Sequence, residues 1–308
     1  MTSTVPISLQ RRFDLTIDGK EVTVTEGQTI LEACRQVQVD VPTLCYLETL
    51  TPVNVCRLCV VEVKGSRTLV SACSRKVEPK MEILTDSSRV NTSRRMVLEL
   101  LASSVDLSLA DDEVGHWMQQ YDVHPERHGP QSDPAEAGER DRSHAGEHKA
   151  IDGSTAETVA QPIKRDNGQY LRDYSRCILC YKCVEACGDD AQNTFAIAVA
   201  GRGFEARIST EYNVALPESA CVYCGNCVAV CPTGALMPTI EFDLRESGKW
   251  DPKSQTVTQT VCPYCGVGCN LELHVQDNQI FKVTSPLDHS TTSGNLCIKG
   301  RFGFEFVH

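Results

Sequence analysis

Two closely spaced runs of four cysteines constrain this chain of 308 residues more than any other feature. Each run has the spacing Cys-x2-Cys-x2-Cys-x3-Cys, and together they comprise Cys177, Cys180, Cys183 and Cys187, then Cys221, Cys224, Cys227 and Cys231. In this spacing three thiolates hold one [4Fe-4S] cluster and the fourth holds the neighbouring cluster. The predicted ligand sets are therefore Cys177, Cys180, Cys183 and Cys231 for one cluster, and Cys221, Cys224, Cys227 and Cys187 for the other.

Zinc ribbons and disulfides are the alternatives for these runs. A structural zinc ion normally takes two Cys-x2-Cys pairs, whereas each run here crowds four thiolates together. Seventeen cysteines would indicate a disulfide scaffold in a short secreted chain, but sixteen of these fall into four quartets. The grouping favours metal clusters in a reducing compartment, so we expect a cytoplasmic protein. The seventeenth, Cys34, lies in a helical pattern and is predicted to be a buried apolar residue without chemistry.

A third quartet, nearer the N-terminus, follows a predicted β-hairpin and helix. Apolar and polar residues alternate on both sides of the turn at Asp18-Gly19, and Thr25 with Gln28 is the expected helix cap. The cysteines that follow have the spacing C-x10-C-x2-C-x13-C and are Cys45, Cys56, Cys59 and Cys73. One close pair with two dispersed cysteines suits a [2Fe-2S] cluster or zinc, and the hairpin and helix favour the cluster.

The fourth quartet lies near the end of the given sequence. Its spacing, C-x2-C-x3-C-x27-C, predicts another [4Fe-4S] cluster on Cys262, Cys265, Cys269 and Cys297. Two strands are expected between the third and fourth of these cysteines, around a turn at Asp277-Asn278. An irregular connector over residues 244–255 is expected to precede the quartet.

Composition argues against two other kinds of partner. The formal net charge is −11 and no basic stripe is present, so no nucleic acid is expected. No apolar run is long enough to span a bilayer, so direct membrane insertion is not expected either. Arg11-Arg12 suggests a twin-arginine export signal, but no apolar segment follows it. An acidic surface is instead compatible with docking to other protein subunits.

These patterns predict an α+β chain with four regions. Residues 1–101 form the [2Fe-2S] domain, 164–240 the double-cluster domain with an inserted hairpin, and 241–308 the last [4Fe-4S] domain. Residues 102–163 are expected to hold a helical remnant and a disordered linker, because 125–161 is polar and rich in Pro, Gly and Ser. The histidines of this region are expected to be solvated rather than metal ligands, namely His116, His124, His128, His144 and His148.

Residues 13–101 resemble the ubiquitin-like (β-grasp) [2Fe-2S] domain of the large subunits of formate dehydrogenases, NADH-quinone oxidoreductase and iron-only hydrogenases. The resemblance is carried by Cys45-Tyr46, Cys56-Arg-Leu-Cys59-Val-Val-Glu-Val63, Ala72-Cys73 and Arg94-Arg-Met-Val-Leu-Glu-Leu-Leu101. In that family a His-x3-Cys-x2-Cys-x5-Cys site for another [4Fe-4S] cluster usually follows. No cysteine lies between Cys73 and Cys177, so we expect that cluster to be missing here.

The last quartet resembles the N-terminal [4Fe-4S] domain of bis-molybdopterin guanine dinucleotide (bis-MGD) enzymes. The resemblance is carried by Cys262-Pro-Tyr-Cys265-Gly-Val-Gly-Cys269 and Asn295-Leu-Cys297-Ile-Lys299, and residues 300–308 are similar to the sequence that follows in formate dehydrogenases. In the family, a lysine at the position of Lys299 lies between cluster and pterin. The resemblance thus implies an electron-relay role for Lys299, whereas an ordinary surface lysine on a turn is the alternative.

Taken together, the resemblance implies an electron-transfer iron-sulfur subunit of a cytoplasmic molybdenum or tungsten formate dehydrogenase, with one [2Fe-2S] and three [4Fe-4S] clusters. Because the pterin-binding part lies outside residues 1–308, we expect bis-MGD on a catalytic partner subunit and no catalytic residue on this chain. An NADH- or flavin-binding subunit, or another acceptor, is the second expected partner. The alternatives are an iron-sulfur adaptor of a hydrogenase or NADH diaphorase complex, a structural zinc protein, and a truncated gene product.

Overall fold

The computed structural model describes residues 11–128, 163–203 and 206–307. The chain divides into two compact units. The first unit comprises Met1–Tyr46, Asn54–Glu99 and His116–Val123, and the second comprises Leu47–Val53, Leu100–Gly115 and His124–His308. Most of the predicted linker, with His144 and His148, lies outside the described residues. The boundaries of the four predicted regions stay predictions.

A five-stranded sheet with the order β2-β1-β5-β3-β4 forms the base of the first unit. Its strands and its first helix are β1 Arg12–Ile17, β2 Lys20–Thr25, α1 Ile30–Gln36, β3 Val60–Val63, β4 Val70–Ser71 and β5 Glu82–Leu84. The β1–β5 pair is parallel, whereas β1–β2, β3–β4 and β3–β5 are antiparallel. The predicted hairpin is confirmed, with Leu15 opposite Val22. The mixture of strands and helix is consistent with the α+β prediction, and the β-grasp assignment stays a prediction.

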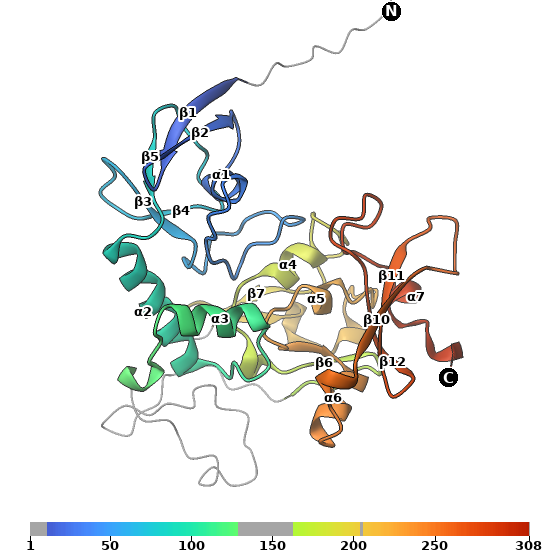
Figure 1. Cartoon of the computed structure of the whole chain (residues 1–308). Helices are drawn as coiled ribbons and strands as arrows, with labels where there is room; N and C mark the ends of the chain where they lie inside the picture. Colours follow the sequence, from blue (N-terminus) through green and yellow to red (C-terminus); the bar gives the residue numbers. More distant parts are fainter. Residues whose placement is uncertain (1–10, 129–162, 204–205, 308) are drawn as a thin grey trace, which may run out of the picture. The chain divides into compact units, whose positions relative to one another are not determined.

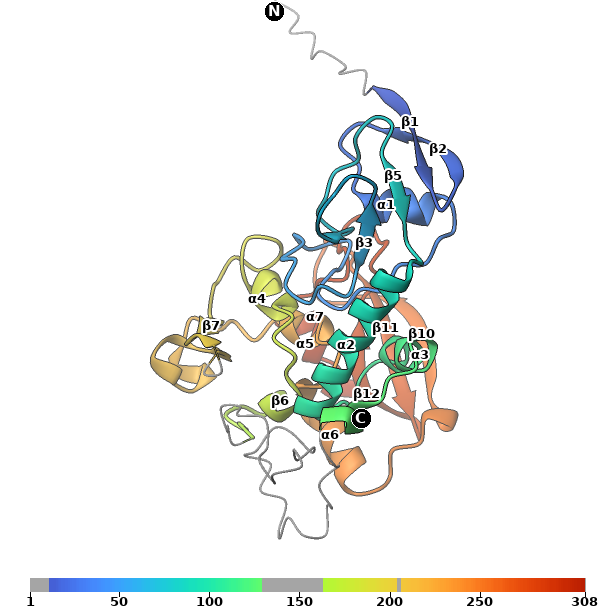
Figure 2. The same ribbon diagram turned by 90° about the vertical axis from the view of Figure 1, so that its left-hand side faces the viewer.

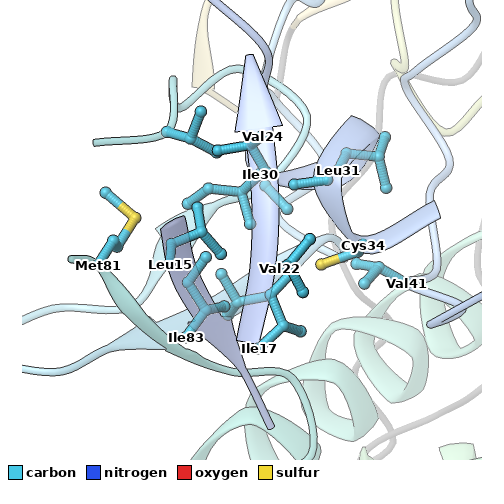
Figure 3. Packing of buried hydrophobic residues seen from close by; sticks show 14 of the residues in the cluster. Leu15, Ile17, Val22, Val24, Ile30, Leu31, Cys34, Val41, Met81 and Ile83 are labelled. Atoms are coloured by element: carbon cyan, nitrogen blue, oxygen red, sulfur yellow. The ribbon is translucent and has the colours of Figure 1, made fainter. Parts of the chain in front are cut away.

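The core of the first unit lies between the sheet and α1 (Figure 1). Alternation along β1 directs Leu15 and Ile17 to one face of the sheet, where they meet Ile30 of α1 (Figure 3). Cys34 is fully buried in the same cluster. Burial raises the pKa of its thiol to about 12. A neutral, enclosed thiol is what an apolar role for this cysteine requires.

The cap of α1 corrects one detail of the sequence interpretation. Thr29, rather than Thr25, begins the helix: the amide of Glu32 donates to Thr29 Oγ1 over 3.1 Å, and the amide of Thr29 donates to Glu32 Oε2 over 2.6 Å. Thr25 ends β2, and its amide donates to Gln28 Oε1 over 2.8 Å. Both Thr-x-x-Gln and Thr-x-x-Glu satisfy the capping-box pattern. Thr25 pairs with Arg12 in the hairpin, so Thr25 belongs to the strand and the Thr25-x-x-Gln28 pattern does not cap the helix.

Replacing Thr29 with alanine should therefore loosen α1 and replacing Thr25 should not. Loss of an N-cap hydroxyl costs about 1 kcal/mol, which is roughly a fivefold increase in local opening. Hydrogen exchange of peptides covering α1, followed by mass spectrometry, measures this opening. Equal exchange in the Thr29→Ala and Thr25→Ala proteins would contradict the assigned cap.

Two further helices, α2 Ser88–Ser104 and α3 Asp112–Gln120, follow the sheet in sequence. Within the first unit, the guanidinium of Arg94 is buried and donates to the carbonyl of Val60 over 2.9 Å and to the hydroxyl of Tyr121 over 2.8 Å. These two hydrogen bonds offset part of the cost of burying the charge, although Nε has no partner among the described residues. The arginine therefore fastens α2 to the strand that follows Cys59.

Short elements around the two cysteine runs make up most of the second unit. They are β6 Tyr170–Arg172, α4 Lys182–Cys187, β7 Ala198–Ala200, β8 Arg207–Ser209, α5 Asn226–Ala229, β9 Leu236–Pro238 and α6 Thr239–Glu246, with 3-10 turns at Pro125–His128, Tyr174–Arg176, Glu211–Asn213 and Leu216–Glu218. β7 and β8 form the predicted hairpin between the runs, and β6 pairs with β9. The helices α4 and α5 lie side by side in both views (Figures 1 and 2). No helix in the described residues is both long and apolar enough to cross a bilayer.

The C-terminal part of the second unit is a three-stranded antiparallel sheet with a short helix. Its elements are β10 Thr256–Val261, β11 Asn270–Gln276, β12 Gln279–Thr284 and α7 Ile298–Phe302, with 3-10 turns at Pro252–Ser254 and Glu305–Val307. The two predicted strands, β11 and β12, are confirmed. The predicted irregular connector is wrong in part, since α6 runs into it as far as Glu246. β10 was not predicted, because every residue of this edge strand is exposed and no burial alternation marks it.

Candidate metal centres

One cavity of the second unit is lined by the first predicted quartet. Its empty space, mouth included, is about 340 Å³. Three of the cysteines come from the first run and the fourth comes from the end of the second run: Cys177, Cys180, Cys183 and Cys231. Tyr174, Ile208 and Leu236 complete much of the wall. The crossed set predicted from spacing is therefore brought together in one place, and its role as a ligand set stays a prediction.

A second cavity, of about 420 Å³ by the same measure, is lined by the other predicted quartet, Cys187, Cys221, Cys224 and Cys227. The crossing has a simple structural basis. Cys183 and Cys187 lie one helical turn apart on α4, so the helix delivers one cysteine to each cavity. The helix α5 carries Cys227 for this cavity, and the chain that leaves it returns Cys231 to the other. Two short helices thus connect the two candidate centres.

The loops of the two runs repeat the same backbone geometry. Leu179 and Tyr223, at equivalent positions, have φ of 53° and 55°, and Tyr181 and Gly225, two residues later, have φ of 65° and 72°. The amide of Leu179 lies 3.5 Å from the sulfur of Cys177, and the amide of Tyr223 lies 3.4 Å from that of Cys221. Leucine and tyrosine adopt a left-handed conformation only at a cost. Both loops are therefore held in a shape that turns main-chain N–H groups towards cysteine sulfur.

Burial makes these thiols reluctant to ionise without a cation. Burial is the main cause that raises the pKa of Cys177 to about 12, and burial also raises the pKa of Cys183 and the pKa of Cys227. The charges of neighbouring thiolates raise the pKa of each in the same direction. Metal ligation requires deprotonated cysteine, and iron supplies the compensating positive charge. The residues present therefore fit a thiolate-bound cluster in each cavity.

Two hydroxyl groups lie against the sulfurs of predicted ligands and were not predicted from the sequence. The hydroxyl of Tyr170 is 3.3 Å from Cys221 Sγ, and that of Thr194 is 3.4 Å from Cys187 Sγ. A hydroxyl that donates to cluster sulfur or thiolate stabilises negative charge and tunes the potential. Neither residue belongs to a spacing motif, so only the folded chain identifies them.

The [2Fe-2S] candidate quartet lies wholly within the first unit. Cys45, Cys59 and Cys73 are buried and Cys56 is half-buried. Hydrogen bonds from Cys56 and Cys73 lower the pKa of Cys45, and the hydrogen bond to Cys45 raises the pKa of Cys73. Cys59 is hydrogen-bonded to Cys73 as well. The four sulfurs thus form one contiguous group, which is what ligation of a small two-iron cluster requires.

The last quartet is more open. Cys262 is buried and Cys269 half-buried, whereas Cys265 and Cys297 are exposed. The amide of Cys262 donates to the carbonyl of Cys269 over 2.8 Å, which closes the first loop. Burial raises the pKa of Cys269, and the charges on the other three cysteines raise it further, so the four lie near one another. Lys299 is exposed on α7, and its predicted relay role stays a prediction.

Zinc stays the alternative metal for these quartets. Across the residues that the structure describes, no three His, Cys, Asp or Glu side chains are arranged to hold one metal ion. The preference for iron-sulfur clusters rests on cysteine spacing, because each of the two close runs crowds four thiolates together.

Arg301 is a further residue that the spacing does not reveal. It lies on α7, four residues after Cys297, and is 4% exposed. Burial lowers the pKa of its guanidinium to about 10, while negative charge on Cys224, Cys227 and Cys297 acts in the opposite direction. The group therefore stays protonated at neutral pH and lies near cysteines of two different quartets.

Comparison with known families places iron-sulfur domains on all four quartets. Residues 10–88 match a 2Fe-2S iron-sulfur cluster binding domain, and residues 176–235 match a 4Fe-4S dicluster domain. Residues 255–308 match the Fe4S4 domain of molybdopterin oxidoreductases. The chain therefore carries iron-sulfur domains of three types, and the last of them is the type found in molybdopterin oxidoreductases.

Known proteins to which this chain is similar differ in their named activities. The NADPH-Fe(3+) oxidoreductase subunit alpha of Geobacter sulfurreducens is 34% identical over 96% of this chain, and "Putative formate dehydrogenase SAUSA300_2258" of Staphylococcus aureus is 26% identical over 97%. These alignments cover 31% and 32% of the two relatives, so the chain spans about a third of their length. A solved NAD+-reducing [NiFe]-hydrogenase chain has a similar fold, with a TM-score of 0.57, 22% identity, and coverage of 74% of this chain and 87% of that chain.

Proposed function

We propose that this chain is the electron-transfer iron-sulfur part of a cytoplasmic molybdenum or tungsten formate dehydrogenase. The clusters, when bound, supply one-electron redox chemistry between a pterin site and an acceptor. One [2Fe-2S] cluster would lie on the quartet from Cys45 to Cys73. Two [4Fe-4S] clusters would lie on the two quartets between Cys177 and Cys231, and a third on the quartet from Cys262 to Cys297. The pterin, bis-MGD, is proposed to lie outside residues 1–308, on a catalytic subunit, and an NADH-, flavin- or other acceptor subunit would exchange electrons at the other end.

The observation that carries this proposal is the last quartet and its surroundings. Residues 255–308 match the Fe4S4 domain of molybdopterin oxidoreductases, which a ferredoxin module alone does not contain. Cys265 and Cys297 of this quartet are exposed, as is Lys299 next to it. An exposed cluster edge with a nearby cation suits exchange of electrons with a group held by another polypeptide segment. Formate as the substrate is supported by the name of the Staphylococcus aureus relative.

An iron-sulfur adaptor of an NADH diaphorase or hydrogenase complex is the second candidate. The Geobacter sulfurreducens relative favours it, because that protein is named for NADPH rather than for formate and shares more identity with this chain. Under this reading the first three cluster sites would serve a pyridine-nucleotide reaction, and the molybdopterin-type domain would be left without an assigned partner.

Metal analysis of the native complex distinguishes the two candidates. The complex should be purified without oxygen and analysed for iron, molybdenum, tungsten and nickel, and its visible absorbance should be followed after addition of formate. We expect iron with molybdenum or tungsten, and bleaching of the iron-sulfur absorbance by formate. Nickel without molybdenum or tungsten, or bleaching by NADPH but never by formate, would support the adaptor instead.

A variant at the last quartet sharpens the test. Cys297→Ala removes a predicted ligand of the cluster that faces the pterin, so formate should no longer bleach the other clusters while dithionite still does. Cys34→Ala is the matched control, because this buried cysteine belongs to no quartet and should leave both responses unchanged. Unimpaired bleaching by formate in the Cys297→Ala complex would exclude the proposed route.

A further inference from the structure

Arg301 connects the last cluster domain to the double-cluster module inside the second unit. Its Nε donates to the carbonyl of Cys224 over 3.0 Å, and Nη2 donates to Oδ1 of Asn226, also over 3.0 Å. Both acceptors belong to the second cysteine run. On the other side, Nη1 donates to the carbonyl of Val283 over 3.1 Å and Nη2 to that of Gly294 over 3.4 Å. One guanidinium thus bonds to both cluster-bearing segments.

The residues around Arg301 pack closely between α7 and the second cysteine run. Asn226 is 3% exposed, and its Oδ1 also accepts the amide of Leu296, 3.0 Å away, next to Cys297. The ring of Phe302 stacks on Tyr170 at 5.9 Å and an interplanar angle of 18°. A side-chain carbon on Gly225 would overlap both Arg301 and Phe302, so this glycine leaves the space that the arginine fills. The contact is therefore an interior packing surface rather than a loose bridge.

The positive charge of Arg301 also affects how easily nearby clusters are reduced. The cysteines whose negative charge reaches the guanidinium are Cys224 and Cys227 of one quartet and Cys297 of another. Each one-electron reduction of a cluster adds one negative charge, and a fixed cation nearby stabilises that charge in a medium of low dielectric constant. Arginine suits this position better than lysine, because its fork supplies several directed hydrogen bonds while keeping its charge.

We propose that Arg301 is a positioning residue between two cluster sites, the quartet of Cys187, Cys221, Cys224 and Cys227 and the quartet of Cys262, Cys265, Cys269 and Cys297. It fixes the two sites against each other and favours the reduced state of both. This inference rests on the proposed function, because it concerns electron passage between these two clusters. Lys299, in contrast, faces solvent and makes no comparable link.

Redox titration of the full chain, reconstituted without oxygen and monitored by paramagnetic resonance, tests the charge. In Arg301→Gln we expect the ratio of reduced to oxidised cluster at a given potential to fall at least about tenfold for both clusters. For a one-electron couple this equals a midpoint potential that is lower by about 59 mV. Asn226→Asp provides a second variant that keeps both hydrogen bonds and adds an opposing charge, so it should shift both clusters in the same direction. Arg301→Lys should keep the potentials close to those of the unmodified chain but unfold at lower urea concentration.

Arg245→Gln is the matched control, since this arginine of α6 is paired with Glu241 and lies over the ring of Trp250 rather than near a quartet. Potentials in Arg301→Gln and Asn226→Asp that match those of Arg245→Gln would overturn the inference. A shift in only one of the two clusters would overturn the placement between them. If Arg301→Gln does not fold, the midpoint potentials of the Asn226→Asp protein alone test the inference. An unmodified chain that takes up no clusters would instead refute the proposed function itself.

Discussion

Replacing Cys187 and Cys224 together with alanine should remove about four iron atoms per chain, no more than either replacement alone. Both cysteines line the same cavity, so both losses should destroy the same cluster. Replacing Cys187 and Cys180 together should remove about eight, because Cys180 lines the other cavity. The measurement is iron and acid-labile sulfide per chain after anaerobic reconstitution, with the number of cluster signals counted by Mössbauer spectroscopy.

The same experiment discriminates between crossed and sequential ligand sets. If each run held its own cluster, Cys187 and Cys180 would belong together, and their double replacement would remove no more iron than a single one. Cys187 and Cys224 would then be the additive pair. Cys34→Ala, which should retain the full iron content, controls for loss of cysteine in general. Additivity for Cys187 with Cys224 would therefore contradict the crossed arrangement.

Local spacing is the basis of the ligand sets predicted for the two close runs. The cysteines of each run are separated by two or three residues, so a short loop brings most of them together, and one turn of α4 directs Cys187 to the other cavity. The strands β1, β2, β11 and β12 were predictable for a similar reason, since alternation and a two-residue turn are local signals.

Other features depend on contacts between distant parts of the chain. Arg301 and Cys224 are 77 residues apart, and nothing around either one indicates that a guanidinium would be buried between two quartets. The positive φ of Leu179, Tyr181 and Tyr223 contradicts local preference, since these side chains disfavour the left-handed region. Sequence rules fail at such positions when the surrounding structure, here a loop around a candidate cluster, outweighs local preference.

Replacing Gly225 with alanine should strongly destabilise the second unit, although this residue is not a predicted ligand. Gly225 has φ of +72°, and an added Cβ would overlap the side chain of Arg301 and lie 2.8 Å from the ring of Phe302. The left-handed conformation costs alanine about 1 to 2 kcal/mol, and overpacking adds about 1 to 3 kcal/mol. We expect the free energy of unfolding to fall by about 2 to 5 kcal/mol in total. The ring stacks on Tyr170 and the guanidinium donates hydrogen bonds to four acceptors, so neither group can move freely away from the new methyl group.

Gly248→Ala isolates the packing contribution. Gly248 has nearly the same φ, +69°, but nothing lies within 4 Å of its added Cβ, so it should lose only the backbone contribution of about 1 to 2 kcal/mol. Loss of cluster absorbance during urea titration, measured without oxygen, compares the two proteins. Equal midpoints would mean that α7 is not packed against the second cysteine run. A lower midpoint for Gly225→Ala, together with a shifted potential of the cluster on Cys221, Cys224, Cys227 and Cys187, would show that packing at Gly225 and the charge of Arg301 act on the same centre.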